Sequence, residues 1–292
     1  MNNDVWINRS YAKINLGLNV VRKRFDGFHD IESGFVYIDW CDTIKVSSSS
    51  HHEIRFLNNS EIDVKKNTVS KALHLFQSHY GLKHHYLIEI NKVIPTGAGL
   101  GGGSSNAASV LRMLNHIENR KLSLDHLLEL GAMIGSDVPF FLLQTTALGT
   151  GLGTTLQPLP IQPKTWIVTV YPNFESSTKE AYAICTPSEP SDLSLERILQ
   201  DTDPEEWHFL LKNDLEYSVI QQWPIIGDIK DQLYDFGAMY SAMSGSGSSV
   251  FGLFEQELVA STAWHSITDL GFRCNLTPPS FKPDIGIYKV NA

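Results

Sequence analysis

The feature that most constrains this chain is a run of five glycines within the seven residues Gly97–Gly103, followed directly by Ser104-Ser105. Alternating apolar residues over Tyr86–Asn91 predict a strand before it, and apolar residues at helical spacing predict a helix after it. Such a segment can bind an anion, because glycines let backbone N–H groups point at the ligand and the helix dipole favours negative charge. A tight turn alone would need a single glycine, so the segment predicts a phosphate-binding loop.

Neither of the common nucleotide-binding loops accounts for this segment. Gly97, Gly99 and Gly102 match the G-x-G-x-x-G pattern of dinucleotide-binding oxidoreductases. That loop should open the first βαβ unit of a parallel sheet, whereas several strands are expected before it here and two helices after it. Gly97 and Gly102 also fit the glycines of a Walker A loop, but Gly103 stands where its lysine is required. A dinucleotide oxidoreductase is therefore a distant alternative.

Composition narrows the class of partners. The 292 residues carry a formal net charge of −9, which argues against a non-specific grip on nucleic acid, because that depends on neutralising phosphates. The three cysteines, Cys41, Cys185 and Cys274, lie far apart, which argues against a zinc site or a disulfide framework. Neither a signal peptide nor an apolar segment of membrane-spanning length is apparent. The sequence thus predicts a cytoplasmic protein without nucleic-acid or membrane partners.

The expected fold is α+β in two domains, because strands and helices are mixed without strict alternation and the length suits two domains. The proline-marked segment Gln157–Pro163 is the candidate linker. It gives an N-terminal domain over residues 1–160 and a C-terminal domain over residues 161–292.

Periodicity predicts the individual elements. Ala12–Val20 alternates as a half-buried strand whose polar face carries Lys13 and Asn15. A helix should begin at Asn67, and Ser123 should cap another. Further strands are expected at Phe35–Trp40, Thr43–Val46, Glu53–Leu57, Trp166–Tyr171, Met239–Met243, Val250–Phe254 and Phe272–Leu276, with a helix at Glu257–Leu270.

Three motifs resemble those of the GHMP kinases, a superfamily named for galactokinase, homoserine, mevalonate and phosphomevalonate kinases. The central motif is Pro95–Ala108, the first is Ala12–Leu16 and the third is Met243–Phe251. Asp26–His29 and Gly135–Phe140 also resemble segments of one family within it, the 4-diphosphocytidyl-2-C-methyl-D-erythritol kinases. The similarity runs nearly end to end.

Two positions depart from that family's pattern. Tyr11 replaces the usual proline before the first motif, and Gly151-Leu152-Gly153-Thr154 stands where the family commonly shows G-x-G-E. The change at Tyr11 concerns only the residue before a strand. The absence of the glutamate at Thr154 weakens any claim that an acid is required there. Neither departure alters a residue expected to take part in the reaction.

The resemblance implies a fold, a reaction and its cofactors. The fold would be the two-domain GHMP-kinase architecture, with an N-terminal domain like domain 2 of ribosomal protein S5 and a ferredoxin-like C-terminal domain. The reaction would be transfer of the γ-phosphoryl group of ATP, with Mg²⁺, to the 2-hydroxyl of a cytidine diphosphate derivative of methylerythritol. The sequence assigns no protein ligand to the metal, and the chain could form a homodimer.

The resemblance also implies the reacting groups. Asp137 would be the base that takes the hydroxyl proton, since a carboxylate beside the apolar run Val138–Leu143 is costly unless it is paired. Lys13 would be its partner, because a nearby cation keeps a carboxylate ionised. Phe28 and His29 would read the cytosine, with Tyr182 as an aromatic residue on the other face of the base.

The remaining assignments follow the same resemblance. Nucleotide binding falls to Pro95, Thr96, Gly97, Ala98, Gly99, Leu100, Gly101, Gly102, Gly103, Ser104 and Ser105, with Asn67 and Lys92. Acceptor binding falls to Asn15, Phe28, His29, Tyr182, Gly245 and Gly247. Two other functions stay open: another GHMP small-molecule kinase of the homoserine or mevalonate type, and a nucleotide-binding protein without catalysis.

Overall fold

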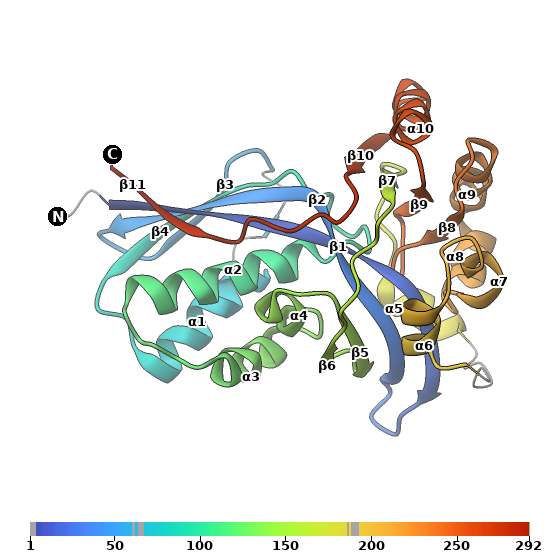
Figure 1. Ribbon diagram of the computed structural model, residues 1–292. Helices are drawn as coiled ribbons and strands as arrows, with labels where there is room; N and C mark the ends of the chain where they lie inside the picture. Colours follow the sequence, from blue (N-terminus) through green and yellow to red (C-terminus); the bar gives the residue numbers. More distant parts are fainter. Residues whose placement is uncertain (1–3, 60–61, 64–66, 186, 188–192, 292) are drawn as a thin grey trace.

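A computed structural model describes residues 4–59, 62–63, 67–185, 187 and 193–291. The central element of the fold is a long antiparallel hairpin of β1 (Asp4–Lys23) and β2 (His29–Ser49), drawn in blue in Figure 1. The sequence predicted two strands within β2, and the structure has one. Tyr11 pairs with Cys41 but Ala12 pairs with Ile38, so a bulge lies between them on β2. That bulge interrupts the alternation, which is why the pattern broke there.

The hairpin forms the centre of a seven-stranded sheet with the order β11-β1-β2-β4-β3, to which β5 and β6 attach through β2. The C-terminal strand β11 pairs antiparallel with the start of β1, so the chain returns to the end of the molecule where it began (Figure 1). The other strands of this sheet are β3 (Glu53–Phe56), β4 (His85–Asn91), β5 (Ala147–Gly151), β6 (Thr155–Pro158) and β11 (Ile287–Asn291).

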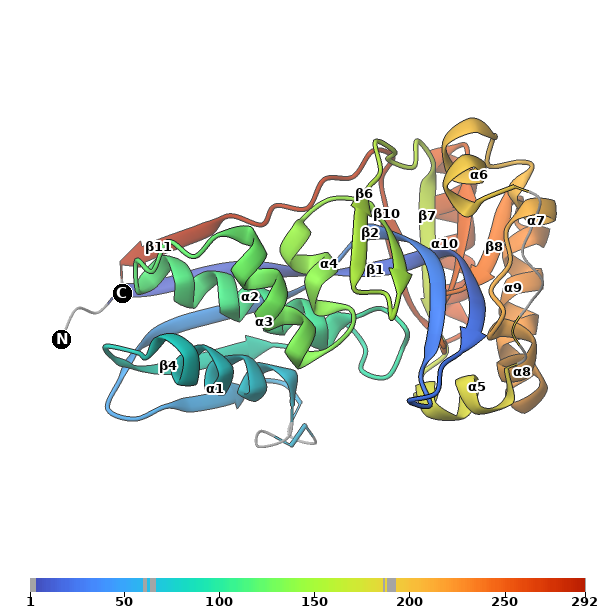
Figure 2. The same cartoon turned by 90° about the horizontal axis from the view of Figure 1, so that it is seen from below.

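Four helices lie together on one face of this sheet, as Figures 1 and 2 show from two sides. They are α1 (Thr68–Tyr80), α2 (Gly102–Ile117), α3 (Leu124–Ile134) and α4 (Val138–Leu143). Their apolar stripes pack with Ile44, Val46, Ile88 and Ile90 of the sheet into one buried core. The predicted cap at Ser123 is confirmed, because Ser123 accepts a hydrogen bond from His126 N at the start of α3. Asn67, where a helix was expected to begin, is the cap of α1 and accepts a hydrogen bond from Ser70 N.

The second half contains a four-stranded antiparallel sheet with the order β10-β7-β9-β8. Along the chain its elements read β7 (Trp166–Tyr171), α9 (Ile225–Asp235), β8 (Tyr240–Met243), β9 (Val250–Phe254), α10 (Glu257–Asp269) and β10 (Arg273–Thr277). This is a β-α-β-β-α-β succession with the first strand between the fourth and the third, which is the ferredoxin-like arrangement. Four shorter helices precede α9: α5 (Thr178–Ile184), α6 (Leu195–Asp201), α7 (Trp207–Leu210) and α8 (Glu216–Gln222).

The two faces of β1 serve the two halves of the molecule. Ala12, Ile14 and Leu16 are fully buried in a core that also contains Phe251 and Leu253 of the second sheet. Because side chains alternate along a strand, the intervening Lys13 and Asn15 point to the opposite face of β1. The domain boundary at residues 160 and 161 stays a prediction. Among the described helices, none is both long and apolar enough to cross a membrane.

Candidate active site

The glycine-rich loop runs from the end of β4 to the start of α2. Gly97, Gly99 and Gly101 all have positive φ, at 57°, 74° and 67°. Helix α2 begins at Gly102 without a side-chain cap, and its first hydrogen bond runs from Ser105 N to Gly101 O. The earlier N–H groups of a helix have no partner within it, so this end has donors to offer an anion.

A second glycine loop, between β8 and β9, docks directly on the first. The Ser244 hydroxyl donates to Gly99 O at 3.0 Å, and Ser249 N donates to Ala98 O at 3.1 Å. A Cβ on Gly99 would lie 2.1 Å from Ser244 O, so glycine is required there by close approach as well as by its φ. The two halves of the chain thus meet backbone to backbone at this point.

A cavity of about 490 Å³ lies at this junction. Most residues assigned to the site from the sequence line it, namely Lys13, Asn15, Asn67, Lys92, every residue from Pro95 to Ser104, Asp137, Tyr182 and Gly245. Four assigned residues are outside its lining: Phe28, His29, Ser105 and Gly247. The Ser105 hydroxyl is instead engaged with Ser10 at 2.7 Å, and Phe28 is largely exposed.

Lys13 and Asp137 meet on the wall of this cavity. Their Nζ and Oδ2 atoms are 3.6 Å apart, and the side chain of Lys13 is only 4% exposed, whereas that of Asp137 is 34% exposed. Lys13 reaches this point from β1, and Asp137 stands immediately before α4. Burial lowers the pKa of the Lys13 ammonium, and the Asp137 carboxylate acts in the opposite direction. The arrangement places a cation beside a partly hydrated carboxylate.

Lys13 is held by a short chain of hydrogen bonds along the hairpin. Its Nζ donates to Asn15 Oδ1 at 2.6 Å, Asn15 Nδ2 donates to Ser33 Oγ at 2.7 Å, and Ser33 Oγ donates to Gly17 O at 2.7 Å. Ser33 is fully buried on β2. Ser33 could not be predicted from the sequence, because a lone serine next to a glycine carries no signal of its own.

The tip of the hairpin brings two of the predicted cytosine-reading residues together. The rings of His29 and Tyr182 stack, with centroids 5.2 Å apart and planes inclined by 25°. A base between them would need ring planes about 7 Å apart, which is twice an ordinary carbon–carbon contact. The two rings must therefore separate before a base can enter between them. Burial, followed by the charge of Lys23, lowers the pKa of His29, so its ring is neutral at pH 7.

The two nucleotide residues assigned outside the loop also have protein partners. Asn67 caps α1 with its oxygen and donates to Asp63 O with its amide, while still lining the cavity. The Lys92 ammonium donates to Asp42 Oδ2 at 2.6 Å and to Ile94 O at 2.8 Å. Burial lowers the pKa of Lys92, against the opposing charge of Asp42.

The second half contributes polar groups that the sequence analysis did not single out as site residues. Thr178 and Ser246 line the cavity, and their hydroxyls are 2.8 Å apart. Glu175 accepts a hydrogen bond from the Thr96 hydroxyl at 2.5 Å, and Ser176 N donates to Gly97 O at 3.0 Å. Within the described part of the chain, no three His, Cys, Asp or Glu residues are grouped as metal ligands.

Comparison with known proteins relates this site to a family. The chain matches two family models, GHMP kinases N terminal domain over residues 67–145 and GHMP kinases C terminal over residues 199–271. A 4-diphosphocytidyl-2-C-methyl-D-erythritol kinase of Parabacteroides distasonis is 42% identical over 250 residues, covering 84% of this chain and 90% of that protein. The enzyme of that name from Pelodictyon phaeoclathratiforme is 37% identical over 279 residues, covering 94% and 96%.

A solved structure shows the same relation in three dimensions. The crystal structure of a 4-(cytidine 5'-diphospho)-2C-methyl-D-erythritol kinase superposes with a TM-score of 0.78 at 30% identity, covering 93% of this chain and 98% of that one. The resemblance read from the motifs and the predicted two-domain α+β fold are thereby confirmed. The chain belongs to the GHMP kinase family and, within it, to the 4-diphosphocytidyl-2-C-methyl-D-erythritol kinases.

Proposed function

We propose that this chain transfers the γ-phosphoryl group of ATP to the 2-hydroxyl of 4-diphosphocytidyl-2-C-methyl-D-erythritol, in the non-mevalonate route to isoprenoid precursors. The names of its relatives supply the acceptor. One observation carries the proposal: Lys13 and Asp137 meet on the wall of the cavity that the glycine loop borders. Phosphoryl transfer depends mainly on positioning and on stabilising charge, and this cavity is arranged for both.

In this proposal the triphosphate lies over the start of α2. The backbone N–H groups of the loop and of the first turn of α2 bind its oxygens, helped by the helix dipole. Pro95, Thr96, Asn67 and Lys92 also contact the nucleotide, as the family resemblance implies. Each of these residues lines the cavity, which supports the assignment.

Asp137 and Lys13 act on the acceptor oxygen. As that oxygen forms its bond to the γ-phosphorus, its proton passes to the Asp137 carboxylate and the bond from phosphorus to the β-γ bridging oxygen breaks, leaving ADP. The Lys13 ammonium stabilises the negative charge that develops on the acceptor oxygen and on the transferring phosphoryl group. The partial exposure of Asp137 supports this role, because substrate can reach it.

The acceptor lies between the hairpin tip and the second glycine loop. Asn15 binds the erythritol end, beside Gly245, where a Cβ would stand 3.1 Å from Asn15 Oδ1. The cytosine is read by Phe28 and His29, with Tyr182 on the other face of the base. The second loop, with Gly245 and Gly247, approaches the diphosphate of the acceptor with its backbone.

Magnesium would accompany ATP. Mg²⁺ keeps several waters and is commonly bound through phosphates and one or two protein oxygens. The Ser104 hydroxyl and the Asp137 carboxylate are oxygen donors on residues that line the cavity near the start of α2, so the residues present fit such an ion. When bound, the ion neutralises charge on the phosphates.

Two further features belong to the proposal. We place the reaction in the cytoplasm, where the three cysteines Cys41, Cys185 and Cys274 would stay reduced. We assign residues 1–160 to the nucleotide and residues 161–292 to the acceptor side, and the chain could act as a homodimer.

The test is ADP release by the purified protein with Mg-ATP. The cytidine-diphospho-methylerythritol would be offered beside homoserine, mevalonate and galactose. Turnover with only the cytidine compound is the expected result. Turnover with another acceptor would keep the kinase and discard the cytosine pocket, and ATP binding without turnover on any acceptor would instead favour a non-catalytic nucleotide-binding protein.

A further inference from the structure

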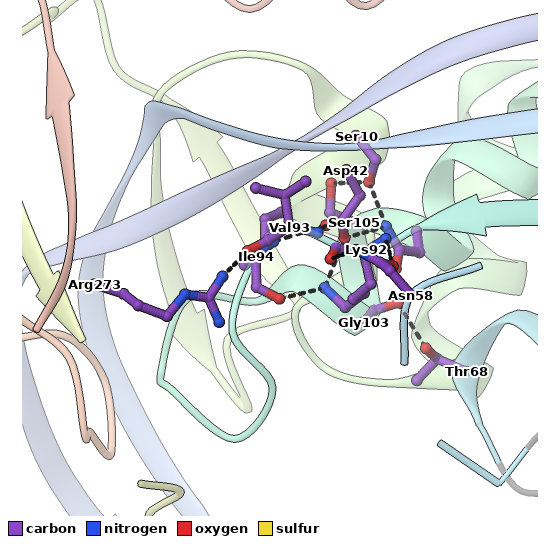
Figure 3. Close-up of polar contacts among 11 residues, drawn as sticks. Ser10, Asp42, Asn58, Thr68, Lys92, Val93, Ile94, Gly103, Ser105 and Arg273 are labelled. Carbon is purple, nitrogen blue, oxygen red and sulfur yellow. Dashed lines mark hydrogen bonds and ion pairs between the residues drawn. The ribbon is translucent and has the colours of Figure 1, made fainter. Parts of the chain in front are cut away.

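Asp42 is a fully buried carboxylate of β2 at which four hydrogen bonds converge (Figure 3). Its Oδ1 accepts from the backbone N–H groups of Val93 at 2.6 Å and Ile94 at 2.8 Å. Its Oδ2 accepts from Lys92 Nζ at 2.6 Å and from Asn106 Nδ2 at 2.8 Å. Both oxygens are therefore saturated by donors, which is how a buried charge becomes tolerable.

These donors stand at the two ends of the glycine-rich loop. Residues 92–94 lead out of β4 directly into Pro95, and Asn106 lies in the first turns of α2. The Lys92 ammonium also lies against the helix start, because a Cβ on Gly102 would be 2.9 Å from its Nζ. A single carboxylate thus fixes the entry and the exit of the loop at once.

A second layer of contacts surrounds the same loop ends (Figure 3). The Lys92 backbone is bracketed by Asn58, which accepts from Lys92 N at 2.7 Å and donates to Lys92 O at 2.6 Å. Asn106 donates to the Ser10 hydroxyl at 3.0 Å, and Thr68 donates to Gly103 O at 2.6 Å. The loop is therefore anchored to β1, β2 and α1, with Asp42 as the charged centre of the anchor.

Asp42 is not part of the cavity lining, whereas Lys92 and Asn106 are. It can therefore influence a nucleotide only through those residues and through the loop. We propose that Asp42 is a positioning residue of the phosphoryl transfer, which holds the glycine-rich loop in the shape that receives the triphosphate of ATP. This inference rests on the proposed function, since it presumes that ATP binds at this loop.

Asp42→Asn tests this role directly, because asparagine has nearly the same size and shape as aspartate but carries no charge. An amide offers one acceptor oxygen in place of two, so two of the four donors must face an NH₂ group instead of an oxygen. If the amide oxygen stays with the backbone N–H groups of residues 93 and 94, Lys92 and Asn106 lose their acceptor. The buried Lys92 ammonium is then left without its counter-charge. If the amide turns over, the loop entry at Val93 and Ile94 is released.

The experiment compares Asp42→Asn, Lys92→Met and the double variant with the wild type. Glu118→Gln is the matched control: Glu118 is also a buried carboxylate, but at the far end of α2, where it accepts from Tyr86 Oη at 2.7 Å. For each protein the melting temperature, the Kd of a non-hydrolysable ATP analogue by calorimetry, kcat, and the KM values for ATP and acceptor are measured. Binding is measured well below each melting temperature.

Asp42→Asn should raise both the analogue Kd and the KM for ATP about tenfold to a hundredfold, the range expected for lost hydrogen bonds to a charged group. Its kcat at saturating ATP and its KM for the acceptor should stay near wild type, because Lys13 and Asp137 are untouched. The double variant should regain melting temperature over Asp42→Asn, since no unpaired ammonium remains, while keeping the weak ATP binding. Glu118→Gln should lose melting temperature only.

Other results would overturn the inference. Unchanged ATP affinity in Asp42→Asn would remove the positioning role, as would a double variant that regains ATP affinity together with stability. A uniform loss of kcat and of both affinities would reduce Asp42 to a folding residue. If the wild type itself binds no ATP analogue and turns over no acceptor, the proposed function falls and this inference falls with it.

Discussion

Among the residues that the structure describes, Lys13 and Lys92 are both buried and each is paired with a carboxylate, but the two pairs are built differently. Lys92 and Asp42 are 2.6 Å apart, and the side chain of Asp42 is completely buried. Lys13 and Asp137 are 3.6 Å apart, and a third of the Asp137 side chain is exposed. Both pairs lie beside the same glycine-rich loop, but only the looser pair has both of its members in the cavity lining.

This difference suits the two carboxylates to different roles: Asp42 positions its neighbours, whereas Asp137 can react with a substrate. A carboxylate that accepts four hydrogen bonds has no free lone pair to offer a substrate, so Asp42 can only fix what surrounds it. Asp137 Oδ2 lies 3.6 Å from Lys13 Nζ and the Asp137 side chain is 34% exposed, so a hydroxyl can approach it and transfer a proton. The comparison predicts that the two carboxylates fail in opposite ways when each is changed to its amide.

The largest effect is expected at Asp137. Asp137→Asn should lower kcat by about 10²–10⁴-fold, the usual contribution of a positioned base, while ATP-analogue binding stays nearly intact. Its melting temperature should fall less than that of Asp42→Asn, because Lys13 keeps its hydrogen bond to Asn15. Initial rates of ADP release and a thermal melt measure the two quantities. Unchanged turnover would remove Asp137 from the chemistry.

In Asp42→Asn, by contrast, the loss of stability should be large and the loss of kcat small. Breaking a buried ion pair by removing one partner costs about 3–5 kcal/mol, so the free energy of unfolding should fall by that order. Urea unfolding of the variant beside wild type and Asp137→Asn checks the ranking. A smaller loss for Asp42→Asn than for Asp137→Asn would mean that the looser pair, rather than the tighter one, holds the fold together.

The pH dependence of kcat sharpens the comparison further. Burial lowers the pKa of Lys13 from an ordinary lysine value of 10.5, so its ammonium loses its proton at a lower pH than a free lysine would. Because the ammonium is the active form, kcat should fall as the pH rises through that lowered pKa, with no loss from Lys13 on the acid side. In Lys13→Arg the guanidinium stays charged, so this alkaline limb should vanish from the profile even where the rate is lower. A limb that persists in Lys13→Arg belongs to another group.

The same two pairs show what the sequence could and could not provide. Lys13 stands on the polar face of an alternating strand and Asp137 adjoins an apolar run, and the family resemblance assigned both as reacting groups. Asp42 carries no such local sign, since it lies beside the irregularity that divided β2 into two expected strands. Its importance arises from contacts with Lys92 and Asn106, which are 50 and 64 residues away along the chain. Periodicity reports which face of an element is buried but not which distant donors share one carboxylate.

The smallest effect is expected at the hairpin tip, which belongs to neither pair. His29 is neutral at pH 7, stacks on Tyr182 and must move to admit a base between the rings, so it contributes at most one or two neutral hydrogen bonds. His29→Ala should therefore raise the KM for the acceptor only about 2- to 10-fold and leave the KM for ATP unchanged.

Phe25→Ala is the matched control for that change, because Phe25 is fully exposed on the same turn and should matter to neither KM. If His29→Ala instead raised the KM for ATP, the hairpin tip would act on the nucleotide side of the cavity. The assignment of the hairpin tip to the acceptor would then have to be withdrawn.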